Sequence, residues 1–348
     1  MRILEAVSTA HANGAVRYAR RIIPELVARG HEVALAALPD SWISRELRGE
    51  VEILETGFER WPPGELRRVA GFVREGGFDL VHSHLTRANL FGALLHTVFG
   101  IRNVAHAHEN KPHPHYWFHD RVLAVSADTL RRHRRYVAGL GKRGAVLPNF
   151  VDTQVFRPAV AGEPDRLREL TGVAAEVPVL IQVGDISPRK GQTVTLAALP
   201  RIWETHPEAR MVFMGRGEPL GFKDDPRVHW LGVREDVPAL LPHATVALLP
   251  STVEPFGMAA IEAMACGVPL VASAVDGLRE VIADGRALPV GVGSTGELAE
   301  AVLSSLGSGE RRAELAERGL SGGRSRFGLD AHMEALMVHL EETLDRHR

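Results

Sequence analysis

The chain has 348 residues, 41 basic and 43 acidic side chains, and an apolar fraction of 45%. This composition is typical of a globular protein and excludes a disordered or fibrous chain, while the length suits about two domains. The single cysteine, Cys266, cannot form an internal disulfide, which favours a reducing cytoplasm. No apolar run reaches the roughly 18 residues that span a bilayer, and the first residues lack a signal-peptide pattern. We therefore expect a soluble cytoplasmic protein.

Charge is shared unevenly along the chain. Residues 1–150 carry 21 basic and 15 acidic side chains, a net charge of +6, and the remainder carries a net charge of −8. A cluster within the basic half comprises Arg131, Arg132, Arg134, Arg135, Lys142 and Arg143. It suggests an anionic partner, such as the inner face of a membrane or a phosphorylated acceptor, with a solvated helix face as the alternative. No nucleic-acid-binding motif is present, so no nucleic acid is expected.

Strand-like and helix-like segments alternate through the first half of the chain. Apolar runs predict strands, and amphipathic segments separate most of them. The first helix is expected at AVRYARRIIPELVARG, and the strands are expected at RILEAVS, HEVALAAL, VEILET, DLVHSH, RNVAHAH, RVLAVS and GAVLPN. Such a series predicts an α/β fold with a mainly parallel sheet and helices on both faces.

The same pattern restarts after a Pro-, Gly- and charge-rich connection over residues 151–176. The strands expected there are VPVLIQVGD, ARMVFMGRG, RVHWLGV, ATVALLPS and PLVAS. We therefore predict two Rossmann-like domains, 1–152 and 153–328, with a C-terminal helix over 329–346 that packs back onto the first. Parallel sheets bind ligands outside the carboxyl ends of their strands, so two such sheets would face each other across one cleft.

The segment EPFGMAAIE, from Glu254 to Glu262, organises the second half. It follows a buried strand, turns at EPFG, and then enters a helix that Gly267 and Pro269 close. The first amides of a helix favour an anion, and the two glutamates flank that position. A phosphate at the amides with sugar hydroxyls at the carboxylates would fit, and a plain surface turn is the alternative.

Two other turns follow predicted strands. Asn13 and Gly14 open the first helix and allow a ligand close to the backbone, although the G-x-G-x-x-G pattern of nicotinamide-binding domains is missing. In QVGDISPRKGQT, Lys190 lies at a strand–loop–helix junction, where it can neutralise a pyrophosphate. A plain turn and a solvated lysine are the respective alternatives.

Histidines occur in two H-x-H pairs, His82 with His84 and His106 with His108. Side chains two residues apart on a strand share a face, so the pairs could hold a metal. No acidic or thiol ligand accompanies them at metal-site spacing, so no metal is predicted. We expect His84 and His108 to project from strand ends into the cleft, and His82 and His106 to be structural histidines with satisfied hydrogen bonds.

Taken in order, several segments resemble the family-4 retaining glycosyltransferases of the GT-B fold. In the second half these are GDISPRKG, MGRGE, VHWLGV and PSTVEPFGMAAIEAMACGVPLVAS followed by DGLREVI. In the first half they are Asn13–Gly14, DLVHSH, VAHAH, VLAVSADT and VLPNFVDTQVFRP. The resemblance covers nearly the whole chain, and its most specific part is the segment with glutamates at positions 254 and 262 and its flanks.

The resemblance implies a role for particular residues. Glu254 matches the residue that contacts donor-sugar hydroxyls, Glu262 the one that binds the ribose, and Lys190 the lysine at the pyrophosphate. His108 matches a histidine beside the donor sugar, so the residues expected to be catalytic are His108, Lys190 and Glu254. The donor-binding residues implied are Gly14, Arg189, Lys190, Arg234, Glu254, Phe256, Gly257, Met258 and Glu262.

One position departs from the family pattern. An arginine usually follows the strand-end glycine directly, and Asp185 stands there in this chain. An acidic side chain facing a pyrophosphate would repel it. Either Asp185 turns away and Arg189 supplies the charge, or phosphate binding is weakened, or the protein is a degenerate member.

The activity that the resemblance implies is transfer of a sugar from a nucleotide diphosphate sugar, such as a UDP- or GDP-sugar, to an acceptor hydroxyl with retention of configuration. No metal or other cofactor is expected. The acceptor would be a glycan, a lipid-linked sugar or a small molecule, bound by first-domain loops at residues 42–63 and 111–119 that carry Trp42, Trp61, Tyr116 and Trp117. The alternatives are a sugar-nucleotide epimerase of the same fold and a catalytically silent binding partner.

Overall fold

The structure is a computed structural model that describes residues 1–58, 63–137 and 144–345. The chain forms two compact units, which we call unit 1 (residues 1–149 and 330–348) and unit 2 (residues 150–329). The sequence placed these boundaries at 152/153 and 328/329. Trp61, Lys142 and Arg143, which the sequence singled out, lie outside the described residues.

Unit 1 is built on a seven-stranded sheet in the order β3-β2-β1-β4-β5-β6-β7, in which all neighbouring strands are parallel. The strands are β1 Arg2–Val7, β2 Glu32–Ala37, β3 Glu52–Glu55, β4 Leu80–His84, β5 Asn103–Ala107, β6 Arg121–Ala124 and β7 Gly144–Val146. The helices are α1 Gly14–Ala28, α2 Trp42–Glu46, α3 Pro63–Glu75, α4 Thr86–Phe99, α5 Ala127–Val137, α13 Leu329–Asp345 and the 3₁₀ helix η1 Pro114–Phe118.

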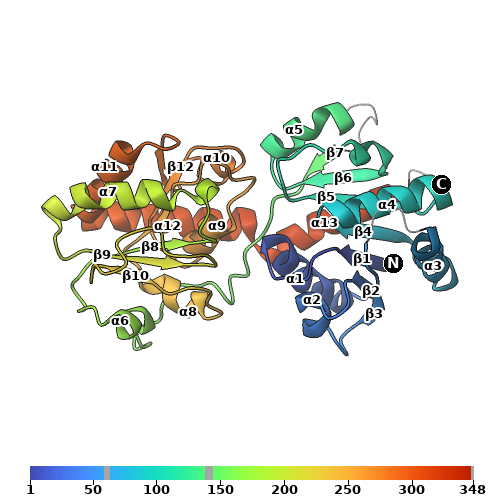
Figure 1. The fold of residues 1–348 in the computed structure, drawn as a ribbon, viewed down its shortest axis with the longest axis horizontal. Helices are drawn as coiled ribbons and strands as arrows, with labels where there is room; N and C mark the ends of the chain where they lie inside the picture. Colours follow the sequence, from blue (N-terminus) through green and yellow to red (C-terminus); the bar gives the residue numbers. More distant parts are fainter. Residues whose placement is uncertain (59–62, 138–143, 346–348) are drawn as a thin grey trace. The chain divides into compact units, whose positions relative to one another are not determined.

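Helices cover both faces of this sheet, because alternate strand residues point to opposite sides. On one face, Val7 and Leu35 pack against Val16 and Ile23 of α1. On the other face, Leu4 and Ala34 pack against apolar residues of α3 and α4. Figure 1 shows the C-terminal helix α13, in red, among the blue and cyan elements of unit 1. Both ends of the chain therefore belong to one unit.

Unit 2 is built on a six-stranded parallel sheet in the order β10-β9-β8-β11-β12-β13. Its strands are β8 Val179–Val183, β9 Arg210–Met214, β10 Val228–Trp230, β11 Val246–Leu249, β12 Leu270–Ser273 and β13 Leu288–Val290. Its helices are α6 Arg166–Thr171, α7 Gln192–Thr205, α8 Val237–Leu240, α9 Met258–Ala265, α10 Leu278–Val281, α11 Thr295–Leu306, α12 Gly309–Phe327, η3 Pro188–Lys190 and η4 Leu241–His243.

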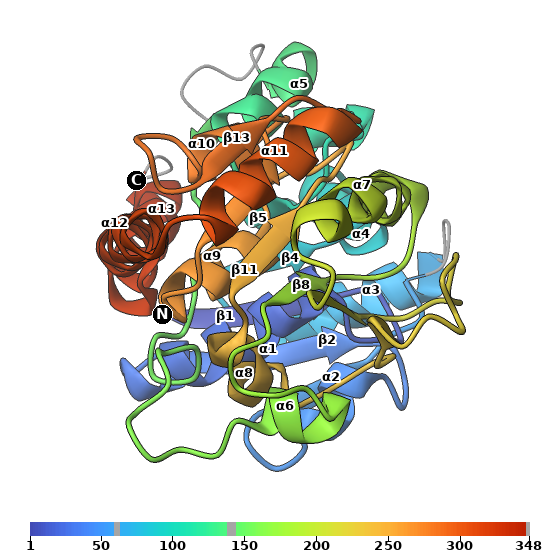
Figure 2. The same cartoon turned by 90° about the vertical axis from the view of Figure 1, so that its left-hand side faces the viewer.

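The core of unit 2 joins its sheet to α7 and α11. Leu199 and Ile202 of α7 and Leu298 of α11 bury against strand residues that include Met211 and Leu248. Figure 2 shows α7 and α11 beside each other, and α9 packs with α12. The sequence predicted the other five strands of this sheet but not β13, which is only three residues long and contains Pro289.

Two findings complete the fold. The first helix runs unbroken from Gly14 to Ala28 through Pro24. Within the described residues, no helix is both long and apolar enough to cross a bilayer.

Candidate active site

The predicted anion site lies where β11 leads into α9. β11 is buried along its whole length, and helix α9 begins at Met258 as the sequence indicated. The residue before it, Gly257, has φ = 106°, and a Cβ there would lie 2.7 Å from Leu278 Cδ1. Glycine is required at this position because an L side chain at such a φ is strained and this one would also collide. The first amides of α9 are thus held in place beyond the end of the strand.

Lys190 and Glu254 come together at this point. Lys190 Nζ lies 2.5 Å from Glu254 Oε2, and both side chains are largely buried. Ser251 also donates a hydrogen bond to Glu254 Oε2, at 3.3 Å, and the Glu254 backbone amide donates to Asp276 Oδ2 at 3.0 Å. The structure thus brings together two residues that are 64 positions apart and were predicted to act on the same ligand. Ser251 and Asp276 support Glu254 and were not predicted, although Ser251 lies two residues after the end of β11.

Close backbone packing holds Lys190 in position. Gly191, which follows it, has φ = 72°, and a Cβ there would lie 2.0 Å from the Pro250 carbonyl oxygen. The Arg189 carbonyl accepts a hydrogen bond from the Thr252 amide at 2.8 Å. The loop that carries Lys190 is therefore fastened directly to the segment that carries Glu254.

The carboxylate of Asp185 is engaged by a neighbouring turn. Asp185 is exposed, and its Oδ1 accepts a hydrogen bond from the Arg216 amide at 3.3 Å. Gly215 and Gly217, on either side of Arg216, have φ of 156° and 131°, and a Cβ at Gly215 would lie 2.0 Å from the Gly184 carbonyl oxygen. The MGRGE turn is thus packed onto the loop that begins at Gly184. Arg189 is exposed on that loop.

The remaining predicted residues of unit 2 have several environments. The ring of Phe256 is buried edge-to-face against Phe327 of α12, so its side chain packs in the interior. Met258 and Glu262 lie half-buried on α9. Arg234 forms a two-pronged ion pair with Asp236, at 2.7 and 2.6 Å.

Two predicted residues, Gly14 and His108, belong to unit 1. Gly14 is the first residue of α1, and the Asn13 side chain caps that helix by accepting a hydrogen bond from the Val16 amide at 3.1 Å. His108 directly follows β5, and its Nε2 lies 3.2 Å from Nδ1 of His84.

His84 belongs to a buried cluster that the sequence did not predict. His82, His84 and His106 are fully buried, as is Glu5 of β1. Glu5 Oε1 lies 3.0 Å from His82 Nδ1, and Glu5 Oε2 lies 2.8 Å from His84 Nε2. The ring of Tyr18 of α1 packs against His84 and His106.

Burial sets the charge state of this cluster. Burial alone would raise the pKa of Glu5, but the two imidazoles bonded to it outweigh burial and lower that pKa to about 2. Burial, together with His82, lowers the pKa of His84 to about 4, and burial lowers the pKa of His106 well below its usual range. Near pH 7, Glu5 is therefore ionised, and His84 and His106 are neutral.

Three expectations about individual side chains were wrong. His84 does not project into a cleft, because Tyr18 and Glu5 enclose it. His82 and His106 are not satisfied: among the described residues, no partner bonds to His82 Nε2 or to either ring nitrogen of His106. Tyr116, expected to contact an acceptor, is fully buried and hydrogen-bonded to Asn89.

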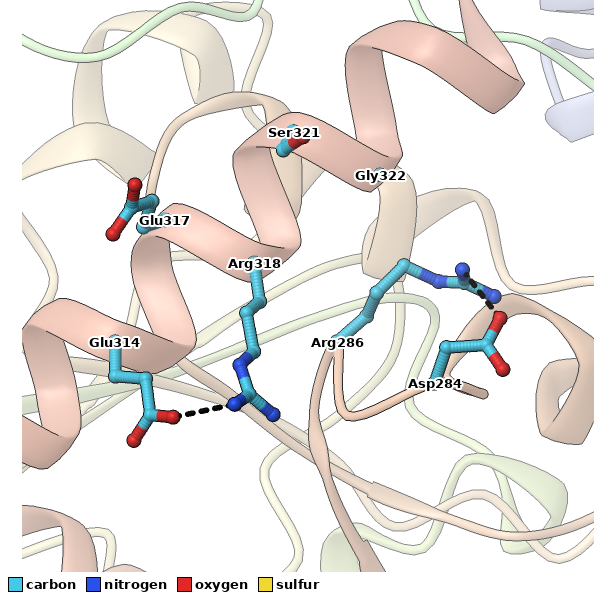
Figure 3. A pocket seen from close by; sticks show the side chains of 7 residues that line it. All are labelled: Asp284, Arg286, Glu314, Glu317, Arg318, Ser321 and Gly322. Atoms are coloured by element: carbon cyan, nitrogen blue, oxygen red, sulfur yellow. Dashed lines mark hydrogen bonds and ion pairs between the residues drawn. The ribbon is translucent and has the colours of Figure 1, made fainter.

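A hollow in unit 2 lies away from the predicted residues. It is lined by Asp284, Arg286, Glu314, Glu317, Arg318, Ser321 and Gly322. Figure 3 shows its guanidinium groups paired with carboxylates, Arg286 with Asp284 at 3.0 Å and Arg318 with Glu314 at 2.6 Å. Because these charges pair with each other and no predicted donor residue lines the hollow, it is not the candidate active site.

Comparison with known proteins defines the class. The model for Glycosyltransferase Family 4 matches residues 12–155, and the model for Glycosyl transferases group 1 matches residues 177–308. The chain belongs to this family of glycosyltransferases and is an enzyme.

Curated relatives and solved structures agree with this assignment. D-inositol 3-phosphate glycosyltransferase 2 of Catenulispora acidiphila is 30% identical over 298 residues, which are 74% of this chain and 69% of the relative. Alpha-maltose-1-phosphate synthase of Mycolicibacterium smegmatis is 31% identical over 60% of this chain and 62% of the relative. Anabaena HepE, solved with UDP and glucose, superposes with a TM-score of 0.84 at 20% identity, covering 97% of this chain and 99% of that chain. That likeness establishes the GT-B fold.

Proposed function

We propose that this enzyme transfers a sugar from a nucleotide diphosphate sugar to an acceptor hydroxyl with retention of anomeric configuration, without a metal at the reacting diphosphate. The observation that carries the proposal is the meeting of Lys190 with Glu254 beside the amino end of α9. The cation and the amino end of the helix suit the diphosphate of such a donor, and the carboxylate suits the hydroxyls of its sugar.

Leaving-group stabilisation is assigned to Lys190 and α9. When the diphosphate departs, negative charge develops on its oxygen, and preorganised cations and amides stabilise such charge. Lys190 supplies a positive charge, and the amides near Gly257 supply hydrogen-bond donors with the favourable helix dipole. Arg189 is on the same loop as Lys190 and exposed, which suits a second cationic contact.

Glu254 is assigned to the donor-sugar hydroxyls and Glu262 to the ribose. The carboxylate of Glu254 accepts a hydrogen bond from Ser251, and its backbone amide is bonded to Asp276, so it presents a preoriented acceptor. Orienting a substrate can lower a barrier by several kcal/mol. As the donor enters, its pyrophosphate replaces Glu254 as the partner of Lys190, and the sugar hydroxyls replace Lys190 as the partners of Glu254.

The names of the relatives support the substrate classes. Relatives that are 30% identical are D-inositol 3-phosphate glycosyltransferases, which supports a polyhydroxylated acceptor, free, in a glycan or lipid-linked. Anabaena HepE was solved with UDP-glucose, which supports a nucleotide diphosphate sugar, such as a UDP- or GDP-sugar, as the donor. His108 is assigned to the donor sugar and Gly14 to the phosphates, as the family resemblance implies. Arg234 is assigned to the region that borders the base.

Peripheral contact with an anionic membrane is a further part of this proposal. Trp117 and Phe118 of η1 are each 48% exposed, and Trp117 is fixed to α5 by a hydrogen bond from Nε1 to the Arg135 carbonyl at 3.0 Å. α5 presents exposed Arg134 and Arg135. Aromatic rings beside arginines suit a surface of anionic lipid head groups.

Substitution of the central pair tests the transferase proposal. We expect Lys190→Ala and Glu254→Ala each to lower kcat/KM for transfer by about 10²–10³, measured with a panel of UDP- and GDP-sugars and by release of the nucleotide diphosphate. The exposed pair Arg201–Glu300, at 3.0 Å in the same unit, gives the matched controls Arg201→Ala and Glu300→Ala, which should keep wild-type rates.

Four outcomes contradict the proposal. Near-wild-type transfer by both central variants removes the mechanism. Turnover of the donor without an acceptor identifies an epimerase, and calorimetric binding without turnover identifies a silent binding protein. NMR of the first-formed product reports the anomeric configuration, and an inverted product excludes retention.

A further inference from the structure

Four polar side chains lie on one face of the unit 1 sheet, remote in sequence from the donor loops of unit 2. The parallel register pairs Glu5 of β1 with His82 of β4, and His84 of β4 with His106 of β5. Tyr18 of α1 covers this face and bonds His332 of α13 through its hydroxyl at 2.8 Å. One ring nitrogen from each of His82, His84 and His106 lies within 4.8 Å of the other two.

We propose that His82, His84 and His106 bind a divalent transition metal, Zn²⁺ by preference, and that Glu5 holds two of these ligands in position. The site belongs to the interior of unit 1. Its role is structural, and it is independent of the diphosphate chemistry assigned to Lys190.

Glu5 fixes the tautomers of two of the ligands. Its carboxylate oxygens can only accept, so His82 carries its proton on Nδ1 and His84 carries its proton on Nε2. The lone pairs are therefore on His82 Nε2 and His84 Nδ1. A carboxylate behind a metal-binding imidazole is the usual outer-shell arrangement at zinc sites, and it makes the ligand more basic.

Unpartnered nitrogens provide the second observation. His82 Nε2 and both nitrogens of His106 are buried with no hydrogen-bond partner among the described residues. A buried polar atom without a partner costs roughly 1–3 kcal/mol. One metal ion bound to both rings would satisfy two such atoms at once.

Charge and geometry also favour a cation. A divalent ion would place positive charge beside the fully buried Glu5 carboxylate, and a buried charge is tolerated when it is paired. Tetrahedral ligation at about 2.0–2.1 Å would place three ligating nitrogens roughly 3.4 Å from one another, and one ring nitrogen of each histidine already lies within 4.8 Å of the other two.

An all-imidazole set selects the metal class. Imidazole suits zinc, copper, nickel and iron, whereas magnesium and calcium prefer oxygen ligands. Zinc has no redox chemistry and accepts a closed tetrahedral site, which fits this interior. The bound ion would join β4 and β5, the strands that carry the three histidines.

Metal analysis of the whole purified chain tests the proposal directly. We expect mass spectrometry to find one zinc ion per chain and a chelator to remove it. Adding Zn²⁺ to the metal-free protein should restore the bound ion and raise the Tm. Co²⁺ added to the metal-free protein should give the visible absorption of a tetrahedral nitrogen site. Absence of stoichiometric Zn²⁺ and Co²⁺ binding to the chelator-treated chain would overturn the proposal.

Matched variants place the metal at this cluster. His106→Leu removes a ring that makes no hydrogen bond, so the protein should fold but lose the Co²⁺ signal. Glu5→Gln should weaken zinc affinity by 10–100-fold, as loss of an outer-shell partner does. This variant still tests the proposal if His106→Leu fails to fold. His115→Leu, a buried histidine of unit 1 outside the cluster, is the control and should bind zinc normally. Metal binding unchanged in His106→Leu and Glu5→Gln contradicts the assignment, whatever the transfer assays show.

Discussion

Gly191 gives a test of how tightly the lysine loop is fastened to its neighbour. Its φ of 72° and the 2.0 Å that would separate an added Cβ from the Pro250 carbonyl oxygen leave no room for a side chain. Backbone atoms cannot move as a flexible side chain can, so Gly191→Ala must push the two segments apart. We expect a loss of about 3 kcal/mol or more in the free energy of unfolding, measured by urea unfolding, together with weaker donor binding.

Gly172→Ala separates backbone strain from the collision. Gly172 has φ = 66°, also in the left-handed region, but a Cβ there would meet nothing within 4 Å. Its alanine variant should lose only about 1 kcal/mol and bind donor normally. Equal losses at the two positions would show that the contact with Pro250 is not tight.

At the residue scale, the sequence could predict local features but not long-range partners. The positions of Lys190 and Glu254 in segments that connect a strand to a helix follow from the apolar runs before them, and the structure places them between β8 and α7 and between β11 and α9. The contact of Glu5 with His82 could not be predicted, since 77 residues separate them and only the strand order makes them neighbours. For the same reason, no acidic partner was recognised beside the paired histidines.

Elements with long apolar runs were the most predictable. β8 and β11 are buried strands whose sequences are almost wholly apolar, and α9 starts where Gly257 ends the turn. β13 was missed because three residues with a central proline carry little strand signal. The prediction for Tyr116 was wrong because the sequence of η1 resembles an irregular loop that exposes its aromatic residues. Packing against α5 decides that Tyr116 is buried and Trp117 is exposed, and the sequence alone does not give this packing.

The η1–α5 surface of unit 1 is expected to bind anionic lipid. Replacing Trp117 and Phe118 together by serine removes the exposed rings, and replacing Arg134 and Arg135 by glutamine removes two positive charges. Each double variant should lower binding to phosphatidylserine-containing vesicles about tenfold or more in a sedimentation assay, since each basic residue near such a surface contributes about 1 kcal/mol.

Val98 of α4 offers a control for this surface. It is 62% exposed and lies on another helix of the same unit, so Val98→Ser should bind vesicles like the wild type. Wild-type binding that does not respond to salt, or variants that bind normally, would exclude the η1–α5 surface as the lipid contact.

At the scale of the whole molecule, the net charges of the two units differ less than the net charges of the two halves of the sequence. α13 returns acidic residues to unit 1, which then contains 23 basic and 20 acidic side chains. The electrostatic argument for an anionic partner therefore depends on the local cluster on α5 rather than on the charge of a whole domain.

Unit 1 should be sensitive to acid because it buries neutral histidines. Burial and neighbouring histidines lower the pKa of His115 to about 3, and burial lowers the pKa of His332 to about 4. The unfolded chain binds these protons near pH 6.5, so the free energy of unfolding is unaffected above pH 6.5 and falls as the pH falls toward the folded values. For His115 alone, we expect a loss of about 2 kcal/mol between pH 7.5 and 5.

Unfolding of metal-free protein in urea, followed by hydrogen exchange in peptides of β4 and β5, measures this loss in unit 1. His115→Leu removes one titrating group, so its unfolding free energy should depend less steeply on pH than that of the wild type. The exposed His11→Gln serves as the control. A wild-type protein equally stable at pH 7.5 and 5 would show that these rings are not held neutral.

The return of α13 to unit 1 has a consequence for biosynthesis. His332, whose Nδ1 bonds the Pro148 carbonyl at 2.7 Å, leaves the ribosome only after all of unit 2 has been translated. At a translation rate of about 5–20 residues per second, the sheet of unit 1 is complete on the order of 10–40 seconds before α13 has been synthesised. A nonsense codon in the region that encodes α13 would therefore damage the unit whose sheet is made first.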